Sequence, residues 1–140
     1  MKVPKSPYES IQGIVYFPRM LDKIRLHRAG GLREDLHENL GKGFDARCVR
    51  FLKVAYDDIA AQVAEGADDE TVLAWCFETG WRPDAEAVEV WSTFMRKVGW
   101  KDGISERLAG RKAEGGWANR DDIETIFDYI DLDEGRPKRE

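Results

Sequence analysis

Residues 84–98 read DAEAVEVWSTFMRKV, and their apolar side chains recur at helical spacing. These apolar residues are Val88, Trp91, Phe94, Met95 and Val98. Side chains three, four and seven positions apart lie on one face of an α-helix. The segment therefore predicts an amphipathic helix that starts at Asp84.

A second apolar stripe, formed by Phe17, Leu21 and Ile24, predicts a helix that begins near Phe17 and stops at Gly30. Further helices are predicted around residues 32–40, from Asp45, from Asp57 or Asp58 to Gly66, from Asp68 or Asp69 to Gly80, around residues 105–109, and from Asn119 to Ile130. Asp45, Asp68 or Asp69, and Asn119 are the expected N-caps. Alternation typical of a strand is confined to residues 13–17.

These patterns predict an all-α fold, a compact irregular bundle of about five to seven short helices. The length of 140 residues suits a single helical domain over residues 1–140. Residues 1–12, which include Pro4 and Pro7, are expected to form an irregular N-terminal arm. Residues 135–140 lack an apolar anchor and are expected to form a mobile tail.

Composition narrows the class of protein. Apolar residues make up 42% and charged residues 35%, and no apolar run is long enough to span a bilayer, so we expect no membrane partner. The net charge of −5 disfavours nucleic acid as a partner, because such binding depends on Lys and Arg. Two cysteines and the lack of an apolar run after the N-terminal lysines favour a reduced, cytoplasmic location.

The charged residues of the segment from Arg19 to Arg47 are the candidate ligand-binding set. They are Arg19, Asp22, Lys23, Arg25, His37, Asn39, Lys42, Asp45 and Arg47. If the predicted first helix meets the segment after it, these groups would form a charged pocket for a small anion or for acid–base chemistry. The competing interpretation, which we favour, is a structural network of ion pairs, with Asp22 pairing Arg19 and Arg25 three positions away.

Residues 41–45, Gly-Lys-Gly-Phe-Asp, precede a predicted helix and allow two interpretations. Backbone N–H groups at a helix start, with Lys42 nearby, can bind an anion. The G-x-x-x-x-G-K-[ST] phosphate motif is absent, however, and Asp45 would place a carboxylate where the anion should lie. A tight turn that requires glycine is therefore the favoured interpretation.

The sequence predicts no metal site and no cofactor. His27 and His37, with Glu34, Asp35 and Glu38, offer only part of a metal geometry, and neither H-E-x-x-H nor a Cys pair at zinc spacing occurs. Cys48 and Cys76 fall on apolar helix faces, where cysteine usually acts as a small hydrophobe. No residue is assigned a catalytic role.

Three segments resemble a bacterial family called domain of unknown function 5069. They are residues 13–25, GIVYFPRMLDKIR; residues 37–48, HENLGKGFDARC; and residues 120–136, which contain RDDI, FDYID and DEGR. The family's name implies no activity. We therefore expect a nonenzymatic module that binds a small anionic ligand or a protein. The alternative is an enzyme of unrecognised type with a pocket built from the segment Arg19 to Arg47.

Overall fold

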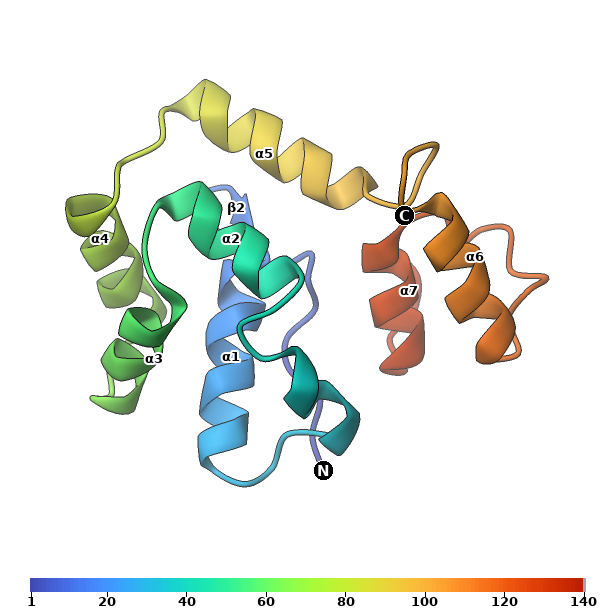
Figure 1. Ribbon diagram of the computed structural model, residues 1–140, viewed down its shortest axis with the longest axis horizontal. Coiled ribbons are helices and arrows are strands. Elements are labelled where there is room, and N and C mark those ends of the chain that lie inside the picture. The colour runs from blue at the N-terminus through green and yellow to red at the C-terminus, as the bar shows by residue number, and fades with distance from the viewer. Residues whose placement is uncertain (140) are drawn as a thin grey trace.

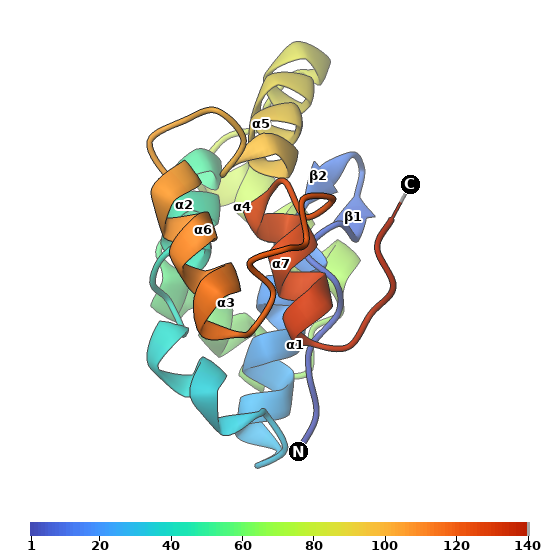
Figure 2. The ribbon, with the colours of Figure 1, turned by 90° about the vertical axis from the view of Figure 1, so that its right-hand side faces the viewer.

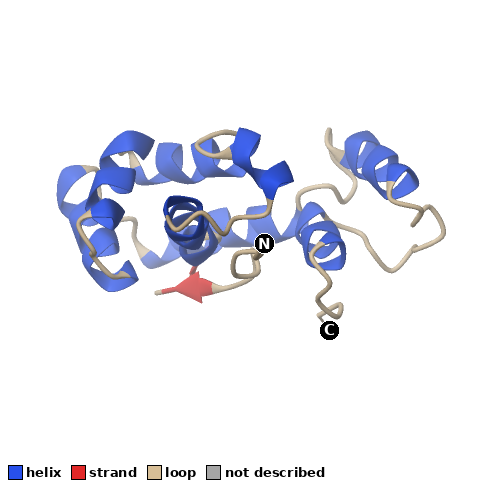
Figure 3. Ribbon diagram, turned by 90° about the horizontal axis from the view of Figure 1, so that it is seen from below, coloured by secondary structure: helices blue, strands red, loops and turns tan. Residues whose placement is uncertain are grey.

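A computed structural model describes residues 1–139 of the chain. Its α-helices are α1 (Phe17–Arg28), α2 (Phe44–Leu52), α3 (Tyr56–Ala64), α4 (Asp69–Thr79), α5 (Ala85–Lys97), α6 (Ser105–Glu114) and α7 (Ile126–Asp133). A 3₁₀ helix, η1, spans Glu34–Asn39, and two short strands, β1 (Ser10–Ile11) and β2 (Ile14–Val15), form an antiparallel hairpin. The predicted helical class is confirmed in a coarser form, because this hairpin makes the fold nearly rather than wholly α (Figure 3).

Helix α1 stands at the centre of the molecule and the other helices surround it. In Figure 1, α3 and α4 lie on one side, α6 and α7 on the other, and α5 crosses the top. Helix α1 packs on α3, while α5 packs on both β2 and α7. Figure 2, turned by 90°, also places α5 at the top of the bundle. Helix α5 therefore connects the α3–α4 side of the molecule to the α6–α7 side.

The apolar core is large around α1 and small around α6. Phe17, Met20, Leu21 and Ile24 of α1 lie in the large cluster, and Phe127 of α7 joins them. The small cluster has only three buried members among the described residues: Val98, Leu108 and Ile126. Less apolar surface is buried at the α6–α7 end, so other interactions must contribute more there.

Several helix starts agree with the sequence pattern. Helix α1 begins at Phe17 with Pro18 in its first turn, as predicted. Asp68 caps α4 by accepting the Thr71 N–H at 2.9 Å, which selects Asp68 over Asp69. Asp84 caps α5 through the Ala87 N–H at 2.8 Å. These signals are local, and the structure confirms them.

Two predicted caps are wrong. Helix α2 begins at Phe44 after Gly43, and the Asp45 side chain accepts no cap hydrogen bond because it turns into the interior. Helix α7 begins at Ile126, not after Asn119, and is capped by the Thr125 hydroxyl, which accepts from the Asp128 N–H at 3.1 Å. Asn and Thr both cap helices well, so residue type could not distinguish them.

The structure changes the type or the bounds of three other predicted helices. Residues 32–40 contain η1 rather than an α-turn, and the helix expected from Asp57 or Asp58 begins at Tyr56. The helix around residues 105–109 extends to Glu114. On α5, Val88 and Trp91 are half-buried and Met95 is buried, but Phe94 is 48% exposed although it shares the apolar stripe.

Both ends of the chain contact the body. Residues 1–12 were predicted to be irregular, yet they include β1, and Lys2 exchanges backbone hydrogen bonds with Gly31 and Arg33. In the predicted tail, residues 135–140, Arg136 forms ion pairs with Asp131 and Glu134. Residue 140 lies outside the described residues. The backbone bonds of Lys2 join residues far apart in sequence, so the local pattern could not indicate them.

Among the helices of residues 1–139, none combines the length and the apolar character that a bilayer-spanning helix needs.

Candidate functional site

Two basic side chains of α1, Arg19 and Lys23, point into the protein. They stand one helical turn apart, and each is only 3% exposed. Burying a cation is costly unless it is paired and hydrogen-bonded. The partners of these two residues therefore decide whether charge remains for a ligand.

Lys23 binds Asp45 and Tyr16, and we call these three residues the inner cluster. The Lys23 Nζ lies 2.9 Å from the Asp45 Oδ1, and the Tyr16 hydroxyl donates to the same oxygen at 2.6 Å. The Gly41 N–H donates to the Asp45 Oδ2 at 2.9 Å. Both carboxylate oxygens of the fully buried Asp45 are thus occupied by the protein itself.

Burial sets the protonation behaviour of the inner cluster. Desolvation, followed by the negative charge of Asp45, raises the pKa of Tyr16 well above its ordinary value. Desolvation lowers the pKa of Lys23, and Asp45 opposes that shift. At neutral pH Tyr16 is therefore a neutral hydroxyl that donates to Asp45. That arrangement holds a charge in place rather than preparing a base for proton transfer.

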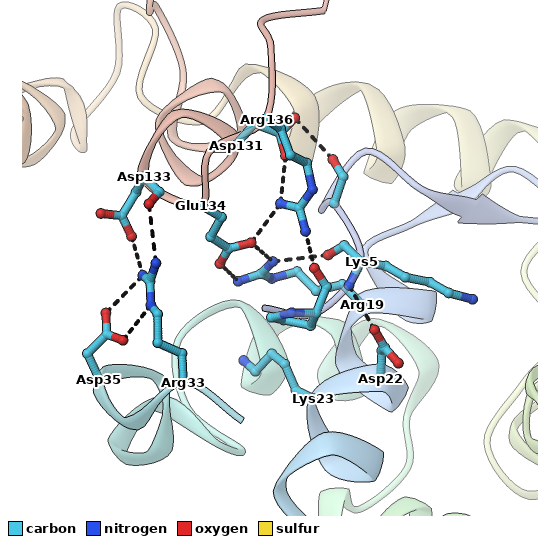
Figure 4. Close-up of polar contacts among 12 residues, drawn as sticks. Lys5, Arg19, Asp22, Lys23, Arg33, Asp35, Asp131, Asp133, Glu134 and Arg136 are labelled. Carbon is cyan, nitrogen blue, oxygen red and sulfur yellow. Dashed lines mark hydrogen bonds and ion pairs between the residues drawn. The ribbon is translucent and has the colours of Figure 1, made fainter. Parts of the chain in front are cut away.

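Arg19 binds the end of α7, and we call Arg19, Asp131, Glu134 and Arg136 the tail network. Arg19 donates to both carboxylate oxygens of Glu134, at 2.8 and 2.6 Å, and to the Lys5 carbonyl at 3.0 Å. Arg136 contacts Glu134 at 2.6 Å and Asp131 at 3.1 Å (Figure 4). A bidentate arginine–carboxylate pair has fixed geometry, so this contact orients both ends of the chain.

The dipole of α7 explains why arginines gather around the acidic residues of the tail network. Asp131, Asp133 and Glu134 lie at the C-terminal end of α7, where the helix dipole disfavours negative charge. Arginines from three other places neutralise them: Arg19 of α1, Arg33 before η1, which lies 2.5 Å from Asp133, and Arg136 after the helix. Arg19, one of the predicted pocket residues, is therefore engaged by the end of α7.

The remaining predicted site residues are scattered. Asp22 accepts the Lys5 N–H at 2.9 Å and pairs with neither arginine, so the predicted pairs of Asp22 with Arg19 and Arg25 are wrong. Arg25 pairs with Asp69 at 2.7 Å. The exposed His37 contacts the Leu32 carbonyl at 2.9 Å.

Arg47, Asn39 and Lys42 lie at the surface or near it. The Arg47 guanidinium lies 5.2 Å from the centre of the Phe94 ring. Asn39 and Lys42 are exposed, and no side-chain hydrogen bond of theirs occurs within residues 1–139. Of the nine predicted residues, the structure brings only Lys23 and Asp45 into direct side-chain contact.

The loop before α2 has the geometry of a tight turn. Gly41 has a φ of 76°, and a Cβ at that position would lie 3.1 Å from the Tyr56 ring. The carboxylate that binds the Gly41 N–H belongs to Asp45, so the protein's own acid fills the place of an anion. The turn interpretation is therefore the better supported of the two.

Cysteine and metal chemistry find little support in the structure. Burial raises the pKa of Cys48 well above its ordinary value and that of Cys76 to about 12, which disfavours the reactive thiolate. Over the described part of the chain, no group of three or more His, Cys, Asp or Glu side chains is placed to hold a metal ion.

Sequence reasoning missed Tyr16 and Glu134 as partners of the α1 cations. Both lie in the segments that resemble the family, but nothing local indicates which charge meets which. It also missed the exposed apolar side chains of α5, because a helical stripe says which residues share a face and not what covers that face.

These observations define a small helical protein whose buried charges are bound by other groups of the same chain. A family model described as "Domain of unknown function (DUF5069)" matches residues 1–136, so the chain belongs to this family, as the resemblance predicted. Among curated proteins, no match to the sequence was found.

Proposed function

We propose that this protein is a nonenzymatic binding module that docks a partner protein on the outer face of α5. The observation that carries the proposal is an exposed apolar pair on that helix. Val90 is 64% exposed and Phe94 is 48% exposed. Because they are four residues apart, both side chains lie on one face of α5. Exposed large apolar side chains in a cluster are typical of interaction sites.

Cations accompany these apolar side chains. Arg47 of α2 stacks over Phe94, and Lys97 lies three residues after Phe94 on the same helix. Just beyond α5, Trp100 is 44% exposed, with the Lys101 ammonium 5.0 Å from its ring. Aromatic residues and arginine are enriched at protein interfaces. These cations gather at the C-terminal end of α5, whereas Glu86 and Glu89 lie nearer its start. The cations favour an acidic partner segment that carries apolar anchors.

The enzyme alternative has weaker support. A pocket built from the Arg19–Arg47 segment needs free charged groups, but the buried cations Arg19 and Lys23 already bind Glu134 and Asp45. The cytoplasmic location belongs to the proposal as well. Two free buried cysteines, Cys48 and Cys76, support a reducing environment.

The proposal is tested with an acidic amphipathic peptide as the probe, by fluorescence anisotropy. Phe94→Ala and Arg47→Gln should each weaken binding by about tenfold, since loss of a central anchor costs more than about 1 kcal/mol. Arg28→Gln removes an exposed cation at the end of α1 and is the matched control, expected to leave binding unchanged.

Three outcomes would contradict the proposal. One is equal binding of the peptide by wild type and Phe94→Ala. Another is equal binding of a matched peptide in which lysine replaces every acidic residue. The third is binding to anionic lipid vesicles without binding to the peptide, which would assign the α5 surface to a membrane.

A further inference from the structure

A surface hollow lies between α6 and α7, away from the inner cluster and from α5. The two helices pack side by side in Figures 1 and 2. The hollow has a volume of about 470 Å³ and is lined by Arg107, Gly110, Arg111, Glu114 and Tyr129. Four of these five residues come from α6 and one from α7. The lining is polar, so the hollow suits a charged ligand better than an apolar one.

Two arginines in this hollow are unpaired. Arg107 and Arg111 are four residues apart and so lie on the same face of α6. Within residues 1–139, neither guanidinium forms an ion pair or a hydrogen bond. Arg19, Arg33 and Arg136, by contrast, each bind a carboxylate. Planar guanidinium groups match the oxygens of phosphate and carboxylate, and two of them line this hollow.

Gly110 lies between the two arginines, in the interior of α6. Glycine there destabilises a helix relative to alanine. Its φ is not in the left-handed region, and a Cβ would meet nothing within 4 Å, so the fold gives no reason for glycine. Glycine does, however, allow a ligand to approach the helix backbone closely. The missing side chain leaves open space above the helix backbone inside the hollow.

Tyr129 and Glu114 complete the lining, the first with a hydrogen-bond donor and the second with a carboxylate acceptor. Burial raises the pKa of Tyr129, so its hydroxyl is a neutral donor at pH 7. Its ring is held edge to face by Trp117, with centroids 6.1 Å apart. Glu114 places one carboxylate beside the two arginines. A bare anion would meet repulsion from Glu114, whereas a ligand that also carries a hydroxyl or ammonium group could donate to it.

We propose that the α6–α7 hollow binds a small phosphate monoester that also carries a hydroxyl or ammonium group. Arg107 and Arg111 hold the phosphate oxygens, and the Tyr129 hydroxyl donates a further hydrogen bond. Gly110 lets the ligand approach the helix backbone, and Glu114 accepts from the hydroxyl or ammonium group. The site is independent of the proposed docking surface on α5, because the two share no residue.

Isothermal titration of the full chain with phosphoethanolamine, and separately with inorganic phosphate, tests the site. Phosphoethanolamine should bind more tightly, because only it has an ammonium group for Glu114. Arg107→Gln with Arg111→Gln should weaken binding at least about tenfold. Glu114→Gln should reduce the preference for phosphoethanolamine over phosphate.

Gly110→Ala best distinguishes a ligand-binding role of this glycine from a purely structural one. It should raise the melting temperature, since alanine is the better helix former, and yet weaken binding about tenfold or more. If no ligand bound beside Gly110, the substitution would raise the melting temperature and leave binding unchanged. Gly103→Ala, in the turn before α6, is a control for binding alone, because a Cβ there also meets open space but lies outside the hollow. Tight binding by Gly110→Ala, or no binding of either probe to the wild type, would overturn the proposal.

Discussion

Arg19 and Lys23 are neighbours on α1 and equally buried, yet they bind different parts of the chain. Lys23 pairs with Asp45, 22 positions away, within the large apolar core. Arg19 pairs with Glu134, 115 positions away, at the end of α7. One helical face therefore holds two connections. The inner cluster joins α1 to α2, and the tail network joins α1 to the C-terminal end.

The difference between the two clusters lies in their surroundings. Asp45 is fully enclosed and has no alternative to its three protein partners. Arg136 of the tail network keeps a quarter of its side chain exposed, so water can replace part of what it loses. A buried charge without a partner costs far more than an exposed one. The inner cluster should therefore be the more sensitive to substitution.

Asp45→Ala should give the largest loss of stability. It leaves the Lys23 ammonium, the Tyr16 hydroxyl and the Gly41 N–H without their partner. Breaking a buried ion pair from one side costs about 3–5 kcal/mol. Urea unfolding measures the change.

Asp57→Ala is the matched control for this substitution. Asp57 is the second residue of α3, as Asp45 is of α2, but it is exposed. Its removal should cost only the dipole interaction, about 0.3–1 kcal/mol. Equal losses for the two variants would mean that burial of Asp45 is not what matters.

Glu134→Ala should give a smaller loss, about 1.5–3 kcal/mol, because Arg19 keeps its hydrogen bond to the Lys5 carbonyl and Arg136 keeps its ion pair with Asp131. The damage should be local. Hydrogen exchange should speed up in α7 and much less in α3. Glu124→Ala, at an exposed acid ahead of α7, should leave both rates unchanged. Uniform acceleration in every helix would show that the tail network does not act locally.

Alkaline pH should destabilise the protein through its buried tyrosines. The unfolded chain releases the Tyr16 proton above about pH 10, whereas the folded chain holds it because burial and Asp45 raise the pKa. Stability is therefore intact below pH 10 and falls as pH rises, by up to about 1.4 kcal/mol per pH unit for one such group.

Two tyrosine variants separate the contributions to this alkaline loss. Tyr16→Phe should flatten the decline in the free energy of unfolding between pH 10 and pH 11, measured in urea. Tyr8→Phe should flatten it by a similar amount, because burial and the hydrogen bond to Asp128 at 2.5 Å raise the pKa of Tyr8 above this pH range as well. An unchanged slope in Tyr16→Phe would show that this hydroxyl is not held neutral.

The sequence predicted the local parts of this fold well. The stripes and caps at Phe17, Asp68 and Asp84 depend on residues within one or two turns, and the structure confirms them. Thr125, and not Asn119, caps α7. The sequence could not distinguish them, because both residue types suit that role. The spacing of side chains could not indicate backbone pairing between Lys2 and Gly31.

The candidate site was predictable only in part. That α1 charges would meet the segment around Asp45 was a reasonable expectation, since the two segments are close in sequence. The pairing of Arg19 with Glu134 was not, because many acids could have been its partner. The unpaired state of Arg107 and Arg111 follows from the fold of both α6 and α7, which no local motif encodes.

The most direct test of the structural role of the inner cluster is a double-mutant cycle with Lys23→Met and Asp45→Leu, followed by urea unfolding. If the two charges act as a buried structural pair, each single variant loses about 3–5 kcal/mol, and the double variant loses clearly less than either. Losses that simply add would contradict this account, because they would show that Lys23 and Asp45 stabilise the protein independently of each other.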